Sequence, residues 1–389
     1  MRNGAVPVEF ALVAACCRWP LTAEVAADVR RLAGQSLAWG KVLRIARRQR
    51  VSGLVHHALH KTDAPCPAEV RNRLAKGSRA LTRDNLAMAL ETLRLQGRFD
   101  AAGIAVVFLK GAALAQRAYG TIALKHGRDI DLLVPPARAL EALRLLEADG
   151  YALVDPARTL SQAQRNAFVA RGYQMELFDA SRGTRVELHW RLSENPYLTA
   201  AIDPFANGQS VALQGGAVRT LIDADLFAYL CVHGANHSWF RLKWLADLDA
   251  FIGCLGADAL PDLYRHAEGC GAGLCAAQAL ALCERIFGRT LPAGLGEAFA
   301  RDRRVLRLVA IALEAMIGAD PAATLANDAV RQGAALRHRF LLGRGLRFGL
   351  AQCGIMLTAP ADVIRWPVPG PLRFLYPLIR LPSWILRRW

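Results

Sequence analysis

The sequence predicts an α+β fold in which a small mixed sheet is embedded between an N-terminal and a C-terminal helical region. Three observations support this prediction. Apolar residues recur at helical spacing through residues 1–98, and they do so again after Asp203. Between these regions, the stretch from Phe108 to Val134 has the pattern of a strand, a glycine turn, a helix, a turn and a second strand. Residues 173–190 have the pattern of a hairpin with Asp and Gly in its loop.

The N-terminal region, residues 1–98, is predicted to be entirely helical. Pro20, Gly34 and the proline-containing stretch 63–67 separate its segments. The expected helices are Ala11–Cys17, Ala23–Leu32, Trp39–Gln49, Val51–Leu59 and Ala68–Gly97.

The α/β core is predicted to cover residues 99–192. An apolar run, Ile104–Leu109, ends at Lys110-Gly111, a helix follows, and the next strand begins at Asp129. Further along, the pattern predicts a helix over Arg138–Asp149, a strand over Tyr151–Val154, and hairpin strands over Tyr173–Phe178 and Thr184–Trp190.

Residues 193–335 are predicted to form a helical domain that makes the other wall of a cleft. It would begin with a connector containing two small strands, at 211–213 and 218–221, followed by a helix or helix pair over Asp223–Gly253 with Asp223 as its N-cap. Helices rich in Ala and Leu over Ala257–Ala335 would serve as scaffold. Residues 336–389 form a basic, aromatic, proline-containing segment.

Asp129 and Asp131 are the first candidate functional residues. Alternate side chains of a strand point to the same face, so the two carboxylates would project together from Cα atoms about 6.6 Å apart. Two like charges held so close favour a cation between them, and Mg²⁺ or Mn²⁺ prefers such hard oxygen ligands. The alternative is a solvated strand end, which a short D-x-D motif often is.

Gly111 lies upstream of this strand, on a strand-to-helix turn. Backbone N–H groups at such a helix N-terminus bind phosphate readily. Together with the two carboxylates, this turn predicts a site that handles phosphoryl groups.

Three motifs in this order give the chain a family resemblance. K-G-A-A-L at 110–114, R-D-I-D-L-L-V at 128–134 and R-V-E-L-H-W at 185–190 resemble the uncharacterised nucleotidyltransferase family of the polymerase-β-like superfamily. The resemblance implies that the sheet is a nucleotidyltransferase core, with Asp129 and Asp131 as metal ligands and Glu187 as the third carboxylate. The chain departs from better-known members at Ala112, where they carry Ser or Gly, so a hydroxyl contact to phosphate is absent.

The second hairpin strand leaves its polar residues open to several interpretations. Glu187 and His189 share one face, whereas Val186, Leu188 and Trp190 share the other. Glu187 could simply lie on an exposed sheet face, and Glu176 on the facing strand is a rival carboxylate. His189 could neighbour a metal, hydrogen-bond a substrate or pack in the interior.

The 223–253 segment carries a second set of candidates. His233 and His237 are four residues apart on one helical face, but Gly234 stands where the catalytic Glu of a zinc H-E-x-x-H motif would be. The family pattern matches at His233, His237, Trp239, Arg241, Leu242, Lys243, Trp244 and Asp247. It suggests that Lys243 or Arg241 holds a triphosphate and that a histidine contacts nucleotide or acceptor. The alternative is a helix junction in which Lys243 pairs with Asp247.

Composition limits the partners without choosing among them. Lys and Arg exceed Asp and Glu by 49 − 33 = 16, which favours anionic partners such as nucleotides, nucleic acid or acidic lipids. Nine cysteines without a C-x-x-C pair suit a reducing cytoplasm. We expect no signal peptide and no spanning helix. Three roles are compatible with the sequence of the tail: packing onto the body, peripheral contact with a membrane surface, and contact with nucleic acid.

These observations predict a metal-dependent nucleotidyltransferase that moves a nucleoside monophosphate from an NTP to an unknown acceptor and releases pyrophosphate. Lys110, Gly111 and Arg128 would receive phosphate oxygens, with Lys243, His233 and His237 on the opposite wall. The alternatives are a catalytically decayed nucleotide-binding or scaffold protein of a biosynthetic operon, and a toxin-type enzyme that modifies RNA. The acceptor could be a small molecule, glycan, peptide or RNA.

Overall fold

A computed structural model describes residues 6–156, 159–318, 337–358, 376 and 378. The N-terminal region is helical, as predicted. Its first helix begins three residues earlier than expected, and the last extends four residues further. These helices are α1 Val8–Ala15, α2 Ala23–Ala33, α3 Trp39–Arg48, α4 Ser52–Lys61 and α5 Ala68–Ala101.

The predicted mixed sheet is confirmed. It has the strand order β1-β2-β5-β4-β3, with β1 and β2 antiparallel, β2 and β5 parallel, and the remaining pairs antiparallel. The parallel pair brings together two strands that are distant in sequence. The strands are β1 Val107–Phe108, β2 Asp129–Leu133, β3 Ala152–Asp155, β4 Gln174–Asp179 and β5 Thr184–His189.

Helices connect these strands. α6, Gly111–Tyr119, follows the glycine turn, and α7, Ala139–Ala148, follows a 3₁₀ turn over Pro136–Arg138. A further helix, α8 Gln162–Arg171, was not predicted from the sequence. Its signal is a capping box, in which the Ser161 side chain accepts from the Gln164 N–H and the Gln164 side chain accepts from the Ser161 N–H.

The second half begins with the hairpin of β6 Gly208–Leu213 and β7 Gly216–Leu221, close to the two predicted strands. Asp223 is the first residue of α9 and does not cap it, because its carboxylate accepts hydrogen bonds from Arg117 and Gln209 instead. The helices of this half are α9 Asp223–Asn236, α10 Leu242–Leu255, α11 Leu260–Gly269, α12 Gly273–Phe287, α13 Leu295–Arg301, α14 Arg303–Ile317 and α16 Leu346–Leu357, with 3₁₀ turns at Pro196–Leu198 and Ala257–Ala259.

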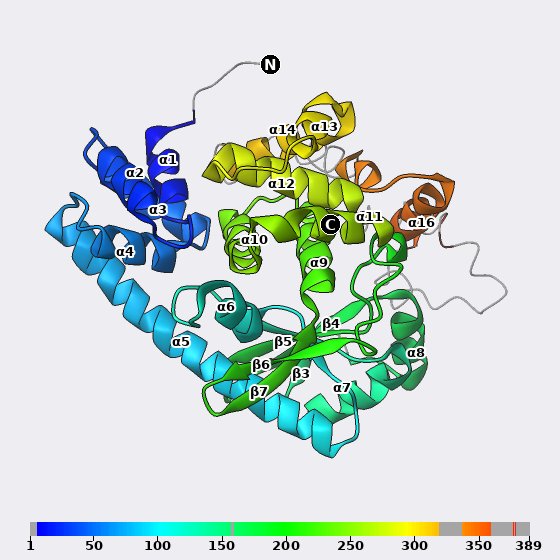
Figure 1. The fold of residues 1–389 in the computed structure, drawn as a ribbon. Helices are drawn as coiled ribbons and strands as arrows, with labels where there is room; N and C mark the ends of the chain where they lie inside the picture. The colour runs from blue at the N-terminus through cyan, green and yellow to red at the C-terminus, as the bar shows by residue number, and fades with distance from the viewer. Residues whose placement is uncertain (1–5, 157–158, 319–336, 359–375, 377, 379–389) are drawn as a thin grey trace.

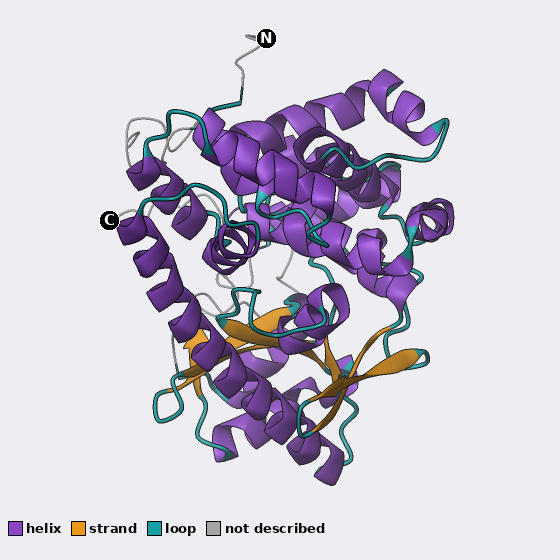
Figure 2. Cartoon of the chain, turned by 60° about the vertical axis from the view of Figure 1, so that its left-hand side comes forward, coloured by secondary structure: helices purple, strands orange, loops and turns teal. Residues whose placement is uncertain are grey.

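The two faces of the sheet have different surroundings. Ile130, Leu132, Val186 and Leu188 pack into a core shared with α5 and α7. The opposite face turns toward α9 and α10, beneath the helices of the second half (Figure 1). The helices of the second half share another hydrophobic core with α1–α4. The strands therefore lie between helices on both sides (Figure 2).

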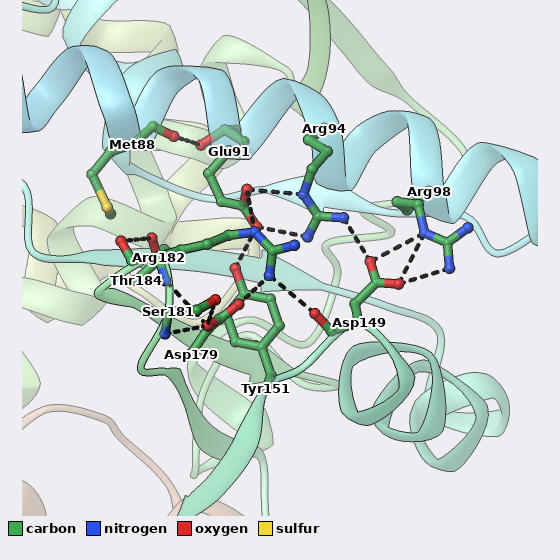
Figure 3. Close-up of polar contacts among 11 residues, drawn as sticks. Met88, Glu91, Arg94, Arg98, Asp149, Tyr151, Asp179, Ser181, Arg182 and Thr184 are labelled. Carbon is green, nitrogen blue, oxygen red and sulfur yellow. Dashed lines mark hydrogen bonds and ion pairs between the residues drawn. The ribbon is translucent and has the colours of Figure 1, made fainter.

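A network of ion pairs fixes α5 against one edge of the sheet (Figure 3). The buried carboxylate of Glu91 accepts from the Tyr151 hydroxyl at 2.6 Å and pairs with Arg94 at 2.7 Å. Arg94 also reaches Asp149 at 2.7 Å, and Arg182 pairs with Asp179 in the hairpin turn. These contacts join a helix of the N-terminal region to the sheet and so hold the sheet in place.

The predicted behaviour of the 336–389 tail concerns a segment that lies largely outside the described residues. In its described part, α16 and residues 337–342 lie against the body, where the His338 ring contacts the Ala235 carbonyl at 2.6 Å. Among the helices of the described ranges, none combines the length and apolarity that a bilayer crossing requires.

Candidate active site

The register of β2 and β5 determines which side chains meet. Asp131 lies directly opposite Glu187, and Asp129 lies opposite Arg185, in a parallel pair. Because side chains alternate along each strand, Asp129, Asp131 and Glu187 all project from the face that turns toward α9 and α10. All three line one cleft. The structure therefore brings the three predicted carboxylates together.

Asp131 is the most buried of these carboxylates. Its side chain is 2% exposed, and its Oδ1 lies 2.8 Å from Lys110 Nζ. Burial alone would raise the pKa of Asp131, but Lys110 and His189 outweigh it and hold the pKa well below its usual value. At neutral pH Asp131 is therefore an anion, and Lys110 is its cation.

Glu187 and His189 complete this cluster. His189 Nε2 lies 3.4 Å from Glu187 Oε2 and 3.7 Å from Asp131 Oδ1. Burial and the neighbouring Asp131 raise the pKa of Glu187. Burial opposes protonation of His189, yet both carboxylates raise its pKa. His189 therefore lies beside the metal-binding candidates with its ring buried, which agrees with two of the three roles predicted for it, a neighbour of a metal and a packed histidine.

These groups could hold a divalent cation. Ligand atoms of Asp131, Glu187 and His189 lie within 4.8 Å of one another. The carboxylate oxygens suit Mg²⁺ or Mn²⁺, and Asp129 adds a further oxygen donor on the same cleft wall. The donor set thus fits the ion that the resemblance implies.

Gly111 begins α6 at the edge of this cluster. Its φ is +64°, a left-handed conformation that glycine adopts without strain. Its neighbour Lys110 precedes the helix, and both residues line the cleft. The first N–H groups of a helix have no intrahelical partner, so this end of α6 can receive an anion.

The opposite wall comes from α9 and the start of α10. Tyr229, His233 and Asn236 line the cleft from α9, and His237 lines it from the turn that follows. Lys110 Nζ lies 3.4 Å from each of the two ring nitrogens of His233, and this contact links the two walls of the cleft. Burial and the charge of Lys110 lower the pKa of His233 well below its usual value, so the ring is neutral.

A basic group lies at the α10 side of the cleft. Lys243 donates to the His126 carbonyl at 2.8 Å, whereas Asp247 pairs with Lys125 at 3.4 Å and accepts from the Tyr119 hydroxyl. The alternative i,i+4 pair of Lys243 with Asp247 is therefore not formed. Lys243 is nearly buried, and its pKa falls to about 7 because of burial and the charge of Lys125.

The cleft has a volume of about 280 Å³, near the lower end of the range of roughly 300–1,000 Å³ for small-molecule sites. Several residues that line it belong to none of the motifs in the sequence and lie far apart along the chain. These are Arg50, Lys125, Tyr173, Gln174, Glu194, Tyr229, Asn236, Phe240 and Arg339.

Two residues considered for the site are placed elsewhere. Arg128 is exposed and does not line the cleft, although it adjoins Asp129. Glu176, the rival of Glu187, forms an ion pair with Arg185 and is also absent from the cleft lining. Glu187 is thus the carboxylate that faces Asp131.

A second group with metal-ligand chemistry lies away from the cleft. Asp225 Oδ1 is 2.7 Å from His266 Nε2, and Cys270 Sγ is 3.5 Å from the same nitrogen. The first distance is that of an ordinary hydrogen bond between a carboxylate and an imidazole. This group joins α9 to α11, and none of its members lines the cleft.

Gly234 has a packing role that explains its place between the two histidines. A Cβ atom there would lie 2.3–2.4 Å from ring atoms of the buried Trp239. We therefore expect Gly234→Ala to lower the free energy of unfolding by about 1–3 kcal/mol, the usual cost of overpacking a core. Urea unfolding measures this, with Gly269→Ala as control because no neighbour lies within 4 Å of its Cβ position in α11. Equal stability of the two variants would contradict the packing role.

Comparison with known proteins agrees with this geometry. No curated protein matches the chain. The model of one protein family, described as uncharacterised nucleotidyltransferase, matches residues 35–288, which include the whole sheet, α9 and α10. The match covers more than half of the chain and contains the three carboxylates, Lys110 and Gly111. The chain therefore belongs to the uncharacterised nucleotidyltransferase family.

Proposed function

We propose that this protein transfers a nucleoside monophosphate from an NTP to a hydroxyl-bearing acceptor and releases pyrophosphate. The observation that carries the proposal is the parallel pairing of β2 with β5. It sets Glu187 opposite Asp131, with Asp129 on the same face, in a cleft that also contains cationic side chains. Carboxylates beside phosphate-binding cations suit phosphoryl transfer, in which positioning and electrostatics supply most of the catalysis.

Asp129, Asp131 and Glu187 are the residues that would hold one or two Mg²⁺ or Mn²⁺ ions. Such ions, when bound, neutralise charge on the phosphates and stabilise the attacking and leaving oxygens. In the protein without metal, Lys110 balances the charge of Asp131 at 2.8 Å. The same ammonium lies beside the N-terminus of α6, so it can turn to a phosphate oxygen when Asp131 has another cation as its partner.

The remaining residues orient the triphosphate and manage the proton. The acceptor oxygen forms a bond to the α-phosphorus, the bond from that phosphorus to the β-bridging oxygen breaks, and pyrophosphate leaves. Glu187, whose pKa is raised by burial and by Asp131, receives the proton of the acceptor hydroxyl. The Gly111 end of α6, Lys125, Lys243 and Arg241 lie around the cleft where they can bind the β- and γ-phosphates.

Pyrophosphate release tests this proposal. The full chain is incubated with each of the four NTPs, Mg²⁺ or Mn²⁺, and a cell extract that supplies acceptors. We expect release from the wild type and its loss in Asp129→Asn, a variant of a half-buried carboxylate for which the structure records no ion pair. Arg138→Gln, outside the cleft, serves as the control variant. NTP binding without any pyrophosphate release would instead favour a decayed nucleotide-binding or scaffold protein. The absence of a hydroxyl at Ala112 is compatible with that alternative.

A further inference from the structure

We propose that His237, Phe240 and Trp244 form a stacking platform for the nucleobase of the NTP. This inference rests on the proposed function and adds to it the way in which the base is bound. The three side chains come from the turn after α9 and the first turn of α10, and all three line the cleft.

The rings form a continuous aromatic surface. The Trp244 ring centroid lies 5.0 Å from that of His237, with 31° between the planes, and 4.9 Å from that of Phe240, with the planes nearly perpendicular. His233 extends the surface inward, 4.8 Å from His237 and 5.4 Å from Trp244. Beyond His233 lies Lys110, the partner of Asp131. The surface therefore runs from the carboxylates to the mouth of the cleft.

Part of this surface faces open space. Phe240 is 39% exposed, although most large apolar side chains of the neighbouring helices are buried. His237 is exposed as well, and Trp244 is half-buried. Burying an exposed phenyl ring in a contact with a flat ligand removes apolar surface from water, which favours binding. A cleft that carries such rings at its mouth is suited to a planar ligand.

The positions of the cations identify the ligand. Arg241 and Lys243 lie between the rings in sequence, and the Arg241 guanidinium lies 5.0 Å from the Phe240 ring centroid. The turn before α10 and the first turn of α10 thus present aromatic faces and phosphate-binding charges in the same cleft. An NTP carries both a flat ring and a polyanion in one molecule. Arg241 and Lys243 each donate to a backbone carbonyl, those of Arg48 and His126, and the phosphates of an NTP would add further acceptors for them.

Stacking predicts a particular pattern of base preference. Every base has a π face, so binding by stacking tolerates all four bases and favours the larger purines. Asn236, which also lines the cleft, is placed to contribute a hydrogen bond to a base edge.

The test compares ATP with a ligand that has the phosphates but no base. Calorimetry with Mg²⁺ measures the affinity of the full chain for ATP and for inorganic tripolyphosphate, in the wild type, Phe240→Ala and Phe240→Leu. Tyr197→Ala is the matched control, because Tyr197 is 41% exposed and lies outside the cleft. We expect both Phe240 variants to lose ATP affinity, with Phe240→Ala weaker by roughly 5- to 100-fold, the scale of one lost aromatic stacking partner. Tripolyphosphate affinity should stay unchanged.

Several results would overturn the platform. Unchanged ATP affinity in both Phe240 variants would do so, as would an equal loss for ATP and tripolyphosphate, since Phe240 would then support the cations rather than the base. A raised KM for the acceptor with unchanged ATP affinity would assign the rings to the acceptor. Failure of the proposed function would give a different result. ATP affinity would then depend on Phe240, but the wild type would release no pyrophosphate with any extract.

Discussion

Replacing Asp131 by Asn is expected to lower the rate of nucleotidyl transfer by roughly 10³-fold or more, the scale on which phosphoryl-transfer sites lose activity when one key electrostatic group is removed. The substitution keeps the shape of the side chain and removes its charge. Asp131 is the most buried carboxylate of the cleft and lies opposite Glu187, so its charge lies within the group of residues proposed to hold the metal. Pyrophosphate release at saturating NTP measures the loss.

The same substitution has a second effect, on stability. Lys110 Nζ lies 2.8 Å from Asp131 Oδ1, and the Lys110 side chain is only 12% exposed. Removing one member of a buried ion pair leaves the other charge uncompensated, which typically costs about 3–5 kcal/mol. We therefore expect Asp131→Asn to unfold at a lower urea concentration than the wild type, in contrast to Asp129→Asn.

A double variant separates the two effects. Asp131→Asn combined with Lys110→Met removes both charges, so much of the lost stability should return while transfer stays absent. Activity that recovered together with stability would show that Asp131 matters only for folding, and the proposed chemistry would fail. A fully stable Asp131→Asn single variant would instead contradict the importance of the buried ion pair.

The sequence was sufficient to predict the local parts of this site. Alternation along one strand places Asp129 and Asp131 on the same face, and the turn at Gly111 precedes a helix as expected. The alternation of side chains along a strand does not predict the order of the strands in the sheet. Glu176 and Glu187 are directly opposite in the hairpin, so pattern alone could not choose between them. The choice depends on β5 pairing with β2, and on Arg185 neutralising Glu176.

The opposite wall shows a different limit. His233, His237 and Lys243 were predicted from their resemblance to a family pattern, and they do line the cleft. Their surroundings depend on long-range packing, which no spacing reveals. Lys243 bonds to a carbonyl in the 120–128 loop rather than to Asp247, one turn away. Arg339 reaches the cleft from the far end of the chain and pairs with Glu194. Such contacts exist only after the helices of the two halves have packed together.

Lys243 gives the second large expected effect, a pH-dependent stability. Its pKa is about 7 in the folded protein against 10.5 for a free lysine, because burial and the repulsion of Lys125 outweigh Asp247 and Asp129. Between these pH values the unfolded chain binds a proton that the folded chain does not. Stability must therefore rise with pH across this window, by at most about 1.4 kcal/mol per pH unit for one group. Below pH 7 the cost of the buried charge is present in full.

Lys243→Met isolates this contribution. Urea unfolding at pH 6, 8 and 9.5 gives the free energy of unfolding of the wild type and of the variant. In the difference between the two values, the contributions of distant titrating groups cancel. We expect the variant to be more stable than the wild type, most at pH 6, with a margin that shrinks as the pH approaches 10. A margin that is constant with pH would mean that Lys243 titrates normally in the folded protein.

Binding of phosphate would explain why the protein keeps a buried lysine that lowers its folding stability. A polyphosphate next to this amine would stabilise its ammonium form, so binding should take up a proton at pH 8, where the free protein holds Lys243 mostly neutral. Calorimetry of tripolyphosphate binding in buffers of different ionisation enthalpy measures that uptake. We expect it in the wild type and not in Lys243→Met, which should also bind the polyphosphate more weakly. Equal proton uptake in both proteins would show that the destabilising lysine does not meet the phosphates, and the triphosphate would then have to lie toward the N-terminus of α6.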